Sequence, residues 1–550
     1  MDTNPAATDE PQGYRASGKG IAGVHSPAID ACFAAFDKPA TPGANVAVIK
    51  AGAVIHRRGY GVANIENDTP FAANTGSQIG STTKQFCATA ILMLEDRCLL
   101  SLTDSIRKFV PEMPAFMDAI TLRHLLSMTS GLPDGLLLPL FAGLPVGGNL
   151  TRAAHLAVLE RLGAPMFAPG AGMTYSNSNY LLLSLAVECV GGQPLGDFLQ
   201  ENIFAPLRMR DTALLSDITA ARQNKAAGYV PGPNGTQRHG AFAIELCGDG
   251  GIVSTLDDMT KWLLHYRYPT LVPRFRDRLE SETRLADGRC IAYRLGITSS
   301  VEQGRRRIAH GGGMPGYLCD FVYYPDDDLG VIVLANGADL SIFEKADAIA
   351  HIVSGTNAPA PQISDLPSGP YVSFTHGYAA ALKQEQGRTV LYLMGERLPL
   401  HRTGTDTFES VKDSVVCPLR VTSEMRNGRP LLELQCGTVE PVVFEPTGEE
   451  AASTTDLTEF TGRYRSPLLR ETHIITIENG ELRIGLDSTL RTLMWTGLMP
   501  HGRDVFSATF ADEPDATDIT LIFRRDEKGR ISGFAYNTFR TRGLVFERQS

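Results

Sequence analysis

The spacing of apolar residues predicts a helix early in the chain. Cys87, Ile91 and Leu94 follow one another at i, i+4 and i+7, which places their side chains on one helix face. Because such a face is buried against a neighbouring element, we expect this helix to lie in a core. Residues 122–128 and 179–190 form two further helical runs, and the first is followed by glycine and proline stop signals.

Short β-prone runs lie on both sides of this helical region. They comprise residues 45–49, 54–58, 307–309, 317–324 and 331–335. Ala51 and Gly52 separate the first two runs and predict a hairpin there. Strands and helices are thus mixed along residues 25–356, which predicts one α/β domain.

The pattern changes between residues 355 and 370, where the chain reads GTNAPAPQISDLPSGP. This stretch is rich in proline, glycine, serine and asparagine, which is typical of a linker. After it, short alternating runs separated by turn residues replace the helical pattern. We therefore expect β-rich domains, barrels or sandwiches, at residues 368–449 and 455–550.

Matching segments within this β-rich part indicate an internal repeat. GPY at residues 369–371 opens the first stretch, and GRY at residues 462–464 opens the second. VFE closes the two stretches at residues 443–445 and 545–547. The sequence therefore predicts two small, related antiparallel β-barrels after the α/β domain. Chance agreement between short segments is the alternative.

Composition and charge narrow the range of functions. The chain has 550 residues, of which 51 are Lys or Arg and 61 are Asp or Glu. Because nucleic-acid-binding proteins carry a basic face, the net charge of −10 argues against that function. No apolar stretch approaches the ~18 residues that a membrane-spanning helix needs, so no membrane association is expected. Residues 1–24 read as a polar tail without a secretory pattern, which predicts a cytoplasmic location.

The nine cysteines are scattered and form no C-x-x-C pair. This spacing argues against a disulfide framework and against a cysteine zinc site. The histidines outside the motifs below also lack the spacing of metal ligands. The sequence therefore predicts no metal and no cofactor.

Three short motifs carry candidate chemistry, and the first is S-x-x-K at Ser81 and Lys84. Serine and lysine three positions apart share one helix face. A serine hydroxyl becomes a good nucleophile only when a base takes its proton, and a partly buried lysine can take part in that transfer. The motif is common, and the alternative is a serine helix cap followed by a surface lysine.

The second motif is Tyr175-Ser176-Asn177, and the third is HGGG at residues 310–313. A tyrosine near cations can act as a general base, and an asparagine can hydrogen-bond both a lysine and a substrate carbonyl. Glycines on a strand edge let a substrate backbone lie close, and a strand N–H can complete an oxyanion hole. Taken alone, the tripeptide is ordinary and the glycines fit a simple turn.

In this order the three motifs resemble the signature of the penicillin-recognising serine hydrolases. That family includes class C β-lactamases, D-alanyl-D-alanine carboxypeptidases and related esterases. HLLSMTSGL at residues 124–132 and GGIVST at residues 250–255 resemble further segments of the same family. The resemblance implies an antiparallel sheet flanked by helices, with a mostly helical lobe inserted.

The resemblance also implies a role for each motif residue. Ser81 would be the acylated nucleophile, and Lys84 and Tyr175 would share the proton transfer. The backbone N–H groups of Ser81 and Gly313 would form the oxyanion hole. The substrate-binding positions would be Asn177, His310, Gly312 and Gly313.

Histidine at position 310, where most β-lactamases have lysine, is similar to the D-aminopeptidase group of this family. That group carries two C-terminal barrels, and a loop of its last barrel places an acidic residue near the free amine of the substrate. The corresponding stretch here, residues 488–500, contains no acid. Its Arg491 would repel an ammonium group, and its Trp495 would offer an apolar wall. Asp487 and Asp504 flank the stretch, and barrel core is the alternative reading for its apolar residues.

The sequence thus predicts a serine hydrolase that acts through an acyl-enzyme. The favoured activity is an aminopeptidase or amidase that releases N-terminal D-amino acids from small peptides or amides. The expected partner is a small-molecule or short-peptide substrate, and a homodimer is one possible assembly. Alternatives are a carboxylesterase or amidase for uncharged acyl groups, a β-lactamase or penicillin-binding-like protein, and a catalytically silent peptidoglycan-binding or peptide-binding protein.

Overall fold

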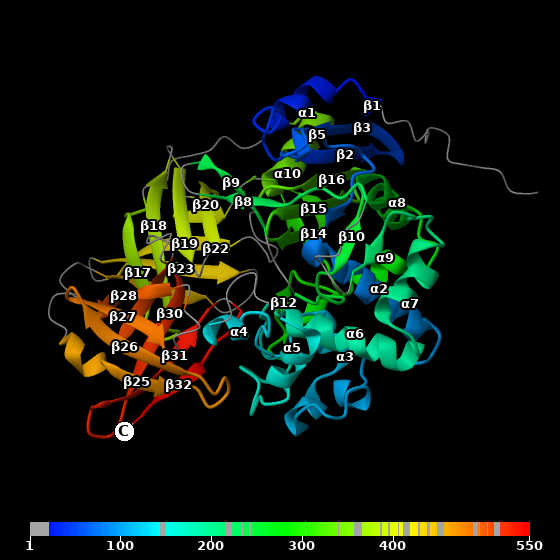
Figure 1. Ribbon diagram of the computed structural model, residues 1–550. Coiled ribbons are helices and arrows are strands. Elements are labelled where there is room, and N and C mark those ends of the chain that lie inside the picture. Colours follow the sequence, from blue (N-terminus) through cyan, green and yellow to red (C-terminus); the bar gives the residue numbers. More distant parts are fainter. Residues whose placement is uncertain are drawn as a thin grey trace, which may run out of the picture.

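In the computed structural model the chain forms an α/β region followed by two β-barrels (Figure 1). The residues that the structure describes are 21–143, 150–215, 223–232, 235–240, 244–302, 304–338, 340, 342–356, 366–385, 388–393, 396–404, 406–410, 419–426, 429–436, 441–447, 456–487, 493, 495–502, 504–510, 517–538 and 540–549.

A seven-stranded antiparallel sheet in the order β1-β3-β2-β16-β15-β14-β13 forms the centre of the α/β region. Its strands are β1 (Ile21–Ala22), β2 (Ala44–Lys50), β3 (Ala53–Tyr60), β13 (Thr298–Glu302), β14 (Arg305–Met314), β15 (Tyr317–Tyr324) and β16 (Leu329–Ala335). The hairpin expected around Ala51 and Gly52 joins β2 to β3. The polar tail expected over residues 1–24 ends in an edge strand, because Ile21 pairs with Arg57 of β3.

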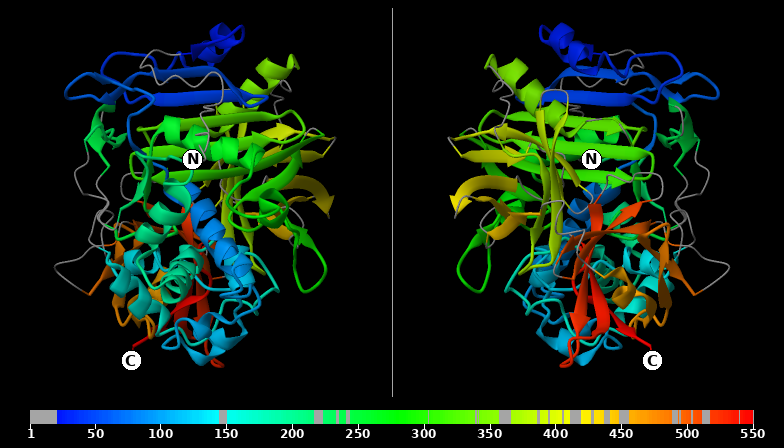
Figure 2. Two further views of the ribbon diagram at one scale, coloured as in Figure 1. Left: turned by 90° about the vertical axis from the view of Figure 1, so that its right-hand side faces the viewer. Right: turned by 90° about the vertical axis from the view of Figure 1, so that its left-hand side faces the viewer.

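The two faces of the sheet pack against two different cores. Successive side chains of β2 point to opposite faces, and from Val46 to Ile49 both sets are apolar and buried. Val46 and Val48 join the core beneath α1 (Ser26–Phe33) and α10 (Phe343–Ser354). Ala47 and Ile49 join the larger core around α2 (Lys84–Asp96) and α8 (Leu256–Arg267). Helices therefore cover both faces of the sheet, as Figure 2 shows.

A helical lobe packs against α2 and is centred on α6 (Asn177–Gly191), a helix that includes the apolar run expected there. The other α-helices are α3 (Leu122–Leu126), α4 (Leu138–Phe141), α5 (Arg152–Leu159), α7 (Leu195–Leu199) and α9 (Phe275–Leu279). Helix α3 ends earlier than the predicted run, because Met128 adopts a left-handed φ of 60°.

Short strands and helical turns connect these elements. The strands are β4 (Val62–Asn64), β5 (Thr69–Pro70), β6 (Ser77–Gln78), β7 (Ala213–Leu214), β8 (Tyr229–Pro231), β9 (Gln237–His239), β10 (Ile252–Ser254), β11 (Thr283–Arg284) and β12 (Cys290–Ile291). The turns are η1 (Gly80–Thr83), η2 (Ile106–Lys108), η3 (Ala115–Ala119), η4 (Gln200–Phe204) and η6 (Leu457–Phe460).

Two closed antiparallel barrels follow the α/β region. The first consists of β17 (Gly369–Ser373), β18 (Tyr378–Glu385), β19 (Arg388–Leu393), β20 (Glu396–Arg402), β21 (Thr407–Ser410), β22 (Leu419–Arg426), β23 (Arg429–Cys436) and β24 (Val442–Pro446). The second consists of β25 (Gly462–Arg465), β26 (Thr472–Glu478), β27 (Glu481–Leu486), β28 (Trp495–Gly502), β29 (Val505–Phe510), β30 (Thr517–Arg525), β31 (Ile531–Asn537) and β32 (Leu544–Arg548).

The internal repeat of the sequence corresponds to equivalent positions in the two barrels. Tyr371 pairs with Pro446 where the first barrel closes, and Tyr464 pairs with Arg548 where the second closes. Each tyrosine hydroxyl donates a hydrogen bond to the carbonyl four residues before it, at 2.9 Å and 2.7 Å. The predicted architecture, an α/β domain followed by two small barrels, is confirmed. Residues 357–365 of the expected linker lie outside the described residues, so the linker stays a prediction.

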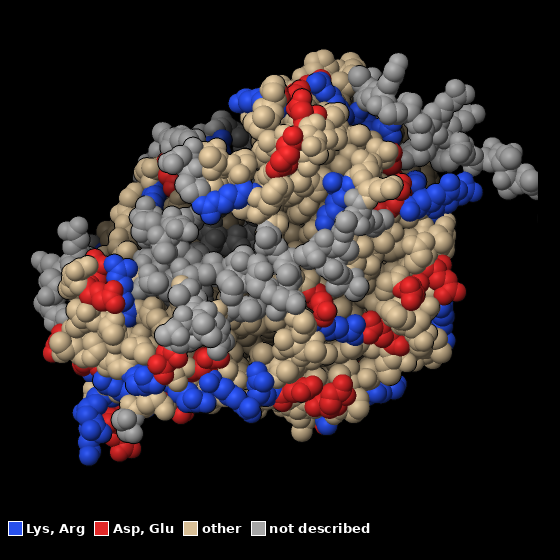
Figure 3. Space-filling model, viewed as in Figure 1, with Lys and Arg blue, Asp and Glu red and all other residues tan. Residues whose placement is uncertain are grey.

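Positive and negative side chains are interspersed on the face shown in Figure 3. Within the described ranges, no helix is long and apolar enough to cross a membrane.

Candidate active site

Ser81 and Lys84 lie where the chain enters α2. Ser81 belongs to the turn η1, is partly exposed, and directly precedes the helix that begins at Lys84. The Lys84 side chain is fully buried, and its Nζ donates to Ser81 Oγ at 3.0 Å. It also donates to Asn177 Oδ1 at 2.8 Å and to the carbonyl oxygen of Asp249 at 2.6 Å. These three acceptors match the three donors of an ammonium group, so Lys84 is held with its charge directed at Ser81.

Asn177 is itself fixed by a buried carboxylate, Asp134. Asn177 Nδ2 donates to Asp134 Oδ2 at 3.0 Å, and the Asn177 backbone N–H donates to Asp134 Oδ1 at 3.3 Å. The amide nitrogen is thereby turned toward Asp134, and the amide oxygen is left facing Lys84. The sequence motifs did not reveal Asp134, because it is 43 residues away from Asn177 along the chain.

Asp249 is a second buried carboxylate beside Lys84. Its Oδ1 accepts a hydrogen bond from the Cys247 N–H at 2.7 Å. Burial raises the pKa of the Asp249 carboxyl, while the charge of Lys84 acts in the opposite direction. Asp249 directly precedes the GGIVST segment, but no motif in the sequence points to it.

Tyr175 lies beside the Ser81–Lys84 pair, in the segment that precedes α6. Lys84 Nζ is 5.0 Å from the centroid of its ring. The tyrosine is buried, and its hydroxyl has no hydrogen-bond partner among the described residues. Because buried hydroxyls are nearly always paired, this group is suited to interact with a substrate or with a transferred proton.

His310 forms the opposite wall on β14, and it is a neutral group there. Its Nδ1 donates to the Gly311 carbonyl at 2.7 Å, and its Nε2 accepts from the Tyr293 hydroxyl at 3.0 Å. Burial, together with the charge of Lys84, lowers the pKa of His310 to about 3. Burial therefore keeps the imidazole uncharged near neutral pH.

The glycines of β14 allow the strand to pass close to the Ser81 turn. A Cβ atom on Gly312 would lie 1.9 Å from the Ile79 carbonyl oxygen and 3.1 Å from the Ser81 nitrogen. A Cβ atom on Gly80, whose φ is +50°, would lie 2.9 Å from the Gly313 nitrogen. Only glycines fit this approach, which brings the backbone nitrogens of Ser81 and Gly313 near each other.

The predicted substrate contacts in the second barrel are only partly described. Arg491 lies outside the described residues, and Trp495 begins β28 with an undescribed side chain. Leu493 is buried in the barrel core, in agreement with the alternative reading of that stretch. Asp487 forms an ion pair with Arg463, and Asp504 pairs with Arg525 at 2.7 Å.

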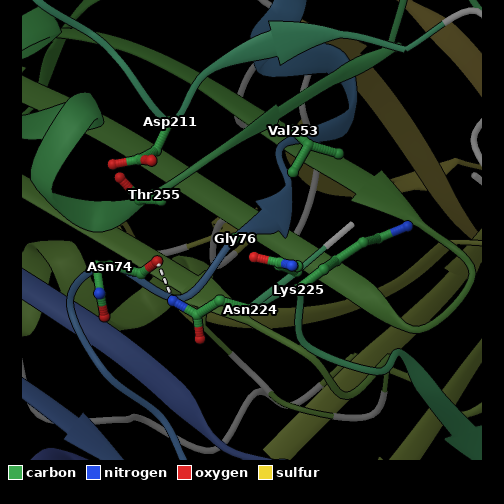
Figure 4. Close-up of a pocket in the computed structure, with 8 residues that line it drawn as sticks. Asn74, Gly76, Asp211, Asn224, Lys225, Val253 and Thr255 are labelled. Atoms are coloured by element: carbon green, nitrogen blue, oxygen red, sulfur yellow. Dashed lines mark hydrogen bonds between the residues drawn. The ribbon is translucent and has the colours of Figure 1, made fainter. Parts of the chain in front are cut away.

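A separate polar cavity of about 90 Å³ lies beside β10, which contributes Val253 to its lining. Figure 4 shows the side chains around it. Asn224 Nδ2 donates to the Asn74 carbonyl oxygen at its rim at 2.7 Å. The cavity is lined by Asn74, Gly76, Asp211, Gln223, Asn224, Lys225, Val253 and Thr255. None of these residues belongs to the S-x-x-K, Tyr175-Ser176-Asn177 or HGGG motif. Within the described ranges, no group of three His, Cys, Asp or Glu side chains is placed to hold a metal ion.

The fold and this site agree with the family comparison. Residues 29–354 match the Beta-lactamase family, and the chain belongs to this family. It is also similar over nearly its whole length to two curated proteins named D-aminopeptidase. The one from Brucella anthropi is 27% identical over 529 residues, covering 92% of this chain and 95% of the relative. The one from Brucella canis is 26% identical, with 92% and 96% covered.

Solved structures share the fold. The octameric penicillin-binding protein homologue from Pyrococcus abyssi is 23% identical, with a TM-score of 0.55 over 76% of this chain and 99% of that chain. The D-amino acid amidase from Ochrobactrum anthropi SV3, complexed with L-phenylalanine amide, is 22% identical. Its TM-score is 0.52 over 60% of this chain and 99% of that chain.

Proposed function

We propose that this protein is a serine hydrolase that forms an acyl-enzyme at Ser81 and releases N-terminal D-amino acids from short peptides or amides. The observation that carries the proposal is the buried Lys84 ammonium, 3.0 Å from Ser81 Oγ at the start of a helix. The similarity to proteins named D-aminopeptidase extends through both barrels and supports the substrate class.

The reaction would proceed by acyl transfer to serine and then to water. Ser81 Oγ would attack the substrate carbonyl carbon while its proton passes to the oxygen of Tyr175, which would act as a phenolate general base beside the Lys84 ammonium. The N–H groups of Ser81 and Gly313 would stabilise the negative oxygen of the tetrahedral intermediate. The same proton would then pass to the leaving amine, so the C–N bond breaks and an ester to Ser81 remains. Water would add to that ester, release the acid and restore the Ser81 hydroxyl.

The remaining motif residues would position these groups. Asn177 would hold Lys84 through its Oδ1 and donate a hydrogen bond from its Nδ2 to the substrate carbonyl, and Gly312 would admit the substrate backbone beside β14. His310, neutral and bonded to Tyr293, would form the wall next to Tyr175. Arg491 and Trp495 stay predicted substrate contacts, and the homodimer and the cytoplasmic location stay predictions.

The proposal is tested with Ser81→Ala and a serine-reactive phosphonate. We expect the phosphonate to label the wild type at Ser81, and Ser81→Ala to lose activity by about 10³-fold or more. Ser101, which is partly exposed like Ser81, offers a control, since Ser101→Ala should keep both labelling and turnover. Wild-type protein that is folded but neither labelled nor active would refute the proposal in favour of a silent binding protein.

An esterase or amidase for uncharged acyl groups is a second candidate, favoured by the ion pairs of Asp487 and Asp504. Because arginines neutralise both carboxylates, neither is free to bind the ammonium group of a substrate.

Paired assays with D-alanine p-nitroanilide and a neutral p-nitrophenyl ester discriminate the two activities. Serine-dependent anilide cleavage supports the aminopeptidase, whereas ester cleavage alone supports the second candidate. A chromogenic β-lactam added as a third substrate tests the β-lactamase alternative.

A further inference from the structure

The β31–β32 hairpin of the second barrel reaches the candidate active site. At its turn, the Arg540 carbonyl oxygen accepts a hydrogen bond from the Asp134 N–H at 3.0 Å. The Arg540 guanidinium Nη1 lies 3.5 Å from Asp134 Oδ2, and its Cζ lies 5.1 Å from the centroid of the Tyr175 ring. This contact comes from a different loop than residues 488–500, the stretch for which the family resemblance predicts substrate contacts.

The turn that presents Arg540 is built by its own hydrogen bonds. The Thr538 N–H donates to the Thr541 carbonyl at 2.7 Å, and Thr538 Oγ1 accepts from the N–H groups of Arg540 and Thr541. At its base, Asn537 Oδ1 accepts from the Gly543 N–H at 2.8 Å. Since this network holds the N–H groups of Arg540 and Thr541 on Thr538, the Arg540 backbone is fixed where its guanidinium can reach Asp134.

Arg540 supplies positive charge to a carboxylate that has no access to water. The Asp134 side chain is 0% exposed, whereas that of Arg540 is 33% exposed. A buried carboxylate is costly unless a cation and hydrogen-bond donors surround it. Asp134 receives Arg540 on one side and the Asn177 side chain on the other, and Asn177 in turn holds Lys84. A continuous chain of polar contacts therefore leads from the second barrel to Ser81.

Arg540 also contributes to the surroundings of Tyr175. Its guanidinium and the Lys84 ammonium lie 5.1 Å and 5.0 Å from the centroid of the same ring. Both cations favour a negative charge on the phenol oxygen, the form in which Tyr175 would take the Ser81 proton. Removing Arg540 would leave the Asp134 charge unbalanced, and that charge would then compete with Ser81 for Lys84.

We propose that Arg540 is a positioning residue that couples the second barrel to the reaction at Ser81. It neutralises Asp134, and through Asn177 it keeps the Lys84 ammonium on the Ser81 hydroxyl. This inference rests on the proposed function, since it concerns the rate of acyl-enzyme formation at the same serine.

The test compares Arg540→Met with Arg542→Met, a matched control two residues along the same turn. Arg542 lies over Tyr378 of the first barrel, 5.4 Å from its ring centroid, so the control removes the same charge without touching Asp134. We expect Arg540→Met to lower kcat and the rate of phosphonate labelling by about 10- to 100-fold, with KM little changed. Arg540→Lys should recover part of this loss, and Arg542→Met should behave as wild type.

A double-mutant cycle with Asp134→Asn identifies the path of the effect. If Arg540 acts through the Asp134 charge, the double variant Asp134→Asn/Arg540→Met should lose less kcat than the two single losses combined.

A wild-type kcat in Arg540→Met, or additive losses of kcat in the cycle, would overturn the inference. If the Met variant does not fold, the Lys variant decides, because its kcat must fall while its thermal unfolding stays close to that of the control. An inactive, unlabelled wild type would instead refute the proposed function, which keeps the two failures distinct.

Discussion

The two barrels share a topology and a sequence repeat, yet they differ in what they contact. The core of the first barrel consists of its own strand residues and Leu366, just before β17. The core of the second barrel also includes Leu138, Phe141 and Val158 of the helical lobe. In Figure 1 the second barrel accordingly lies beside α4. The first barrel thus contacts the second through Val372, Ala379 and Val505, whereas the second barrel also packs against the helical lobe beside the candidate active site.

Polar contacts sharpen this difference. His473 of the second barrel bonds to the Phe141 carbonyl at 2.8 Å, and Arg540 pairs with Asp134. The first barrel bonds instead to the second, where the Ala379 N–H donates to Thr520 Oγ1 at 3.0 Å. The comparison teaches that a repeated β-barrel acquires a new role through a few residues at its surface and turns, while its closing strands stay equivalent.

The largest expected effect comes from truncating equivalent core phenylalanines of the barrels, Phe444 and Phe546. Both are buried, at 1% and 0% exposure, and each alanine variant should lose about 3–5 kcal/mol of stability. Only Phe546→Ala should also lower kcat in the folded protein, because β32 carries the turn with Arg540. Urea unfolding and steady-state kinetics measure the two quantities, and equal losses of kcat would contradict the comparison.

The next effect is a pH dependence that involves His473. Burial lowers the pKa of His473 to about 4, and the hydrogen bond that its Nε2 donates to the Phe141 carbonyl only partly offsets this effect. Its Nδ1 accepts a hydrogen bond from the Tyr536 hydroxyl. Between the ordinary value of about 6.5 and 4, the unfolded state binds more protons than the folded state, so stability falls as pH falls. By pH 4 the loss should approach ~3 kcal/mol.

Unfolding curves collected from pH 7 to pH 4 check this expectation. His473→Gln should remove this part of the dependence, while His376→Gln, at an exposed histidine of the first barrel, should leave it in place. An unchanged pH slope in His473→Gln would show that the contact with the helical lobe is not sensitive to acid.

The smallest effect concerns the contact between the barrels. Thr520→Val removes the acceptor of the buried Ala379 N–H and should cost about 1–2 kcal/mol. Thr520→Ser keeps a hydroxyl and should cost less. Thermal unfolding of the wild type, Thr520→Val and Thr520→Ser measures these differences in stability. A valine variant as stable as the wild type would mean that the barrels do not stabilise each other through this bond.

Much of the architecture and the motif part of the site could be predicted from the sequence. Helical spacing in α2 and α6, the hairpin of β2 and β3 and the β-rich C-terminal part are local patterns, since they depend on near neighbours. The proximity of Ser81 and Lys84 also follows from helix geometry alone. The convergence of Tyr175 and His310 on this pair required the family resemblance, because no local rule joins such distant segments.

The sequence by itself therefore determined the main helices and strands, the barrel repeat and the candidate motifs, because side-chain type and spacing encode them. Only the tertiary structure placed Asp134 behind Asn177, Asp249 behind Lys84 and Arg540 over Tyr175. These contacts join segments far apart along the chain, and their spacing carries no periodic signal. The neutral state of His310 was likewise decided by folding, because burial rather than residue type sets its charge.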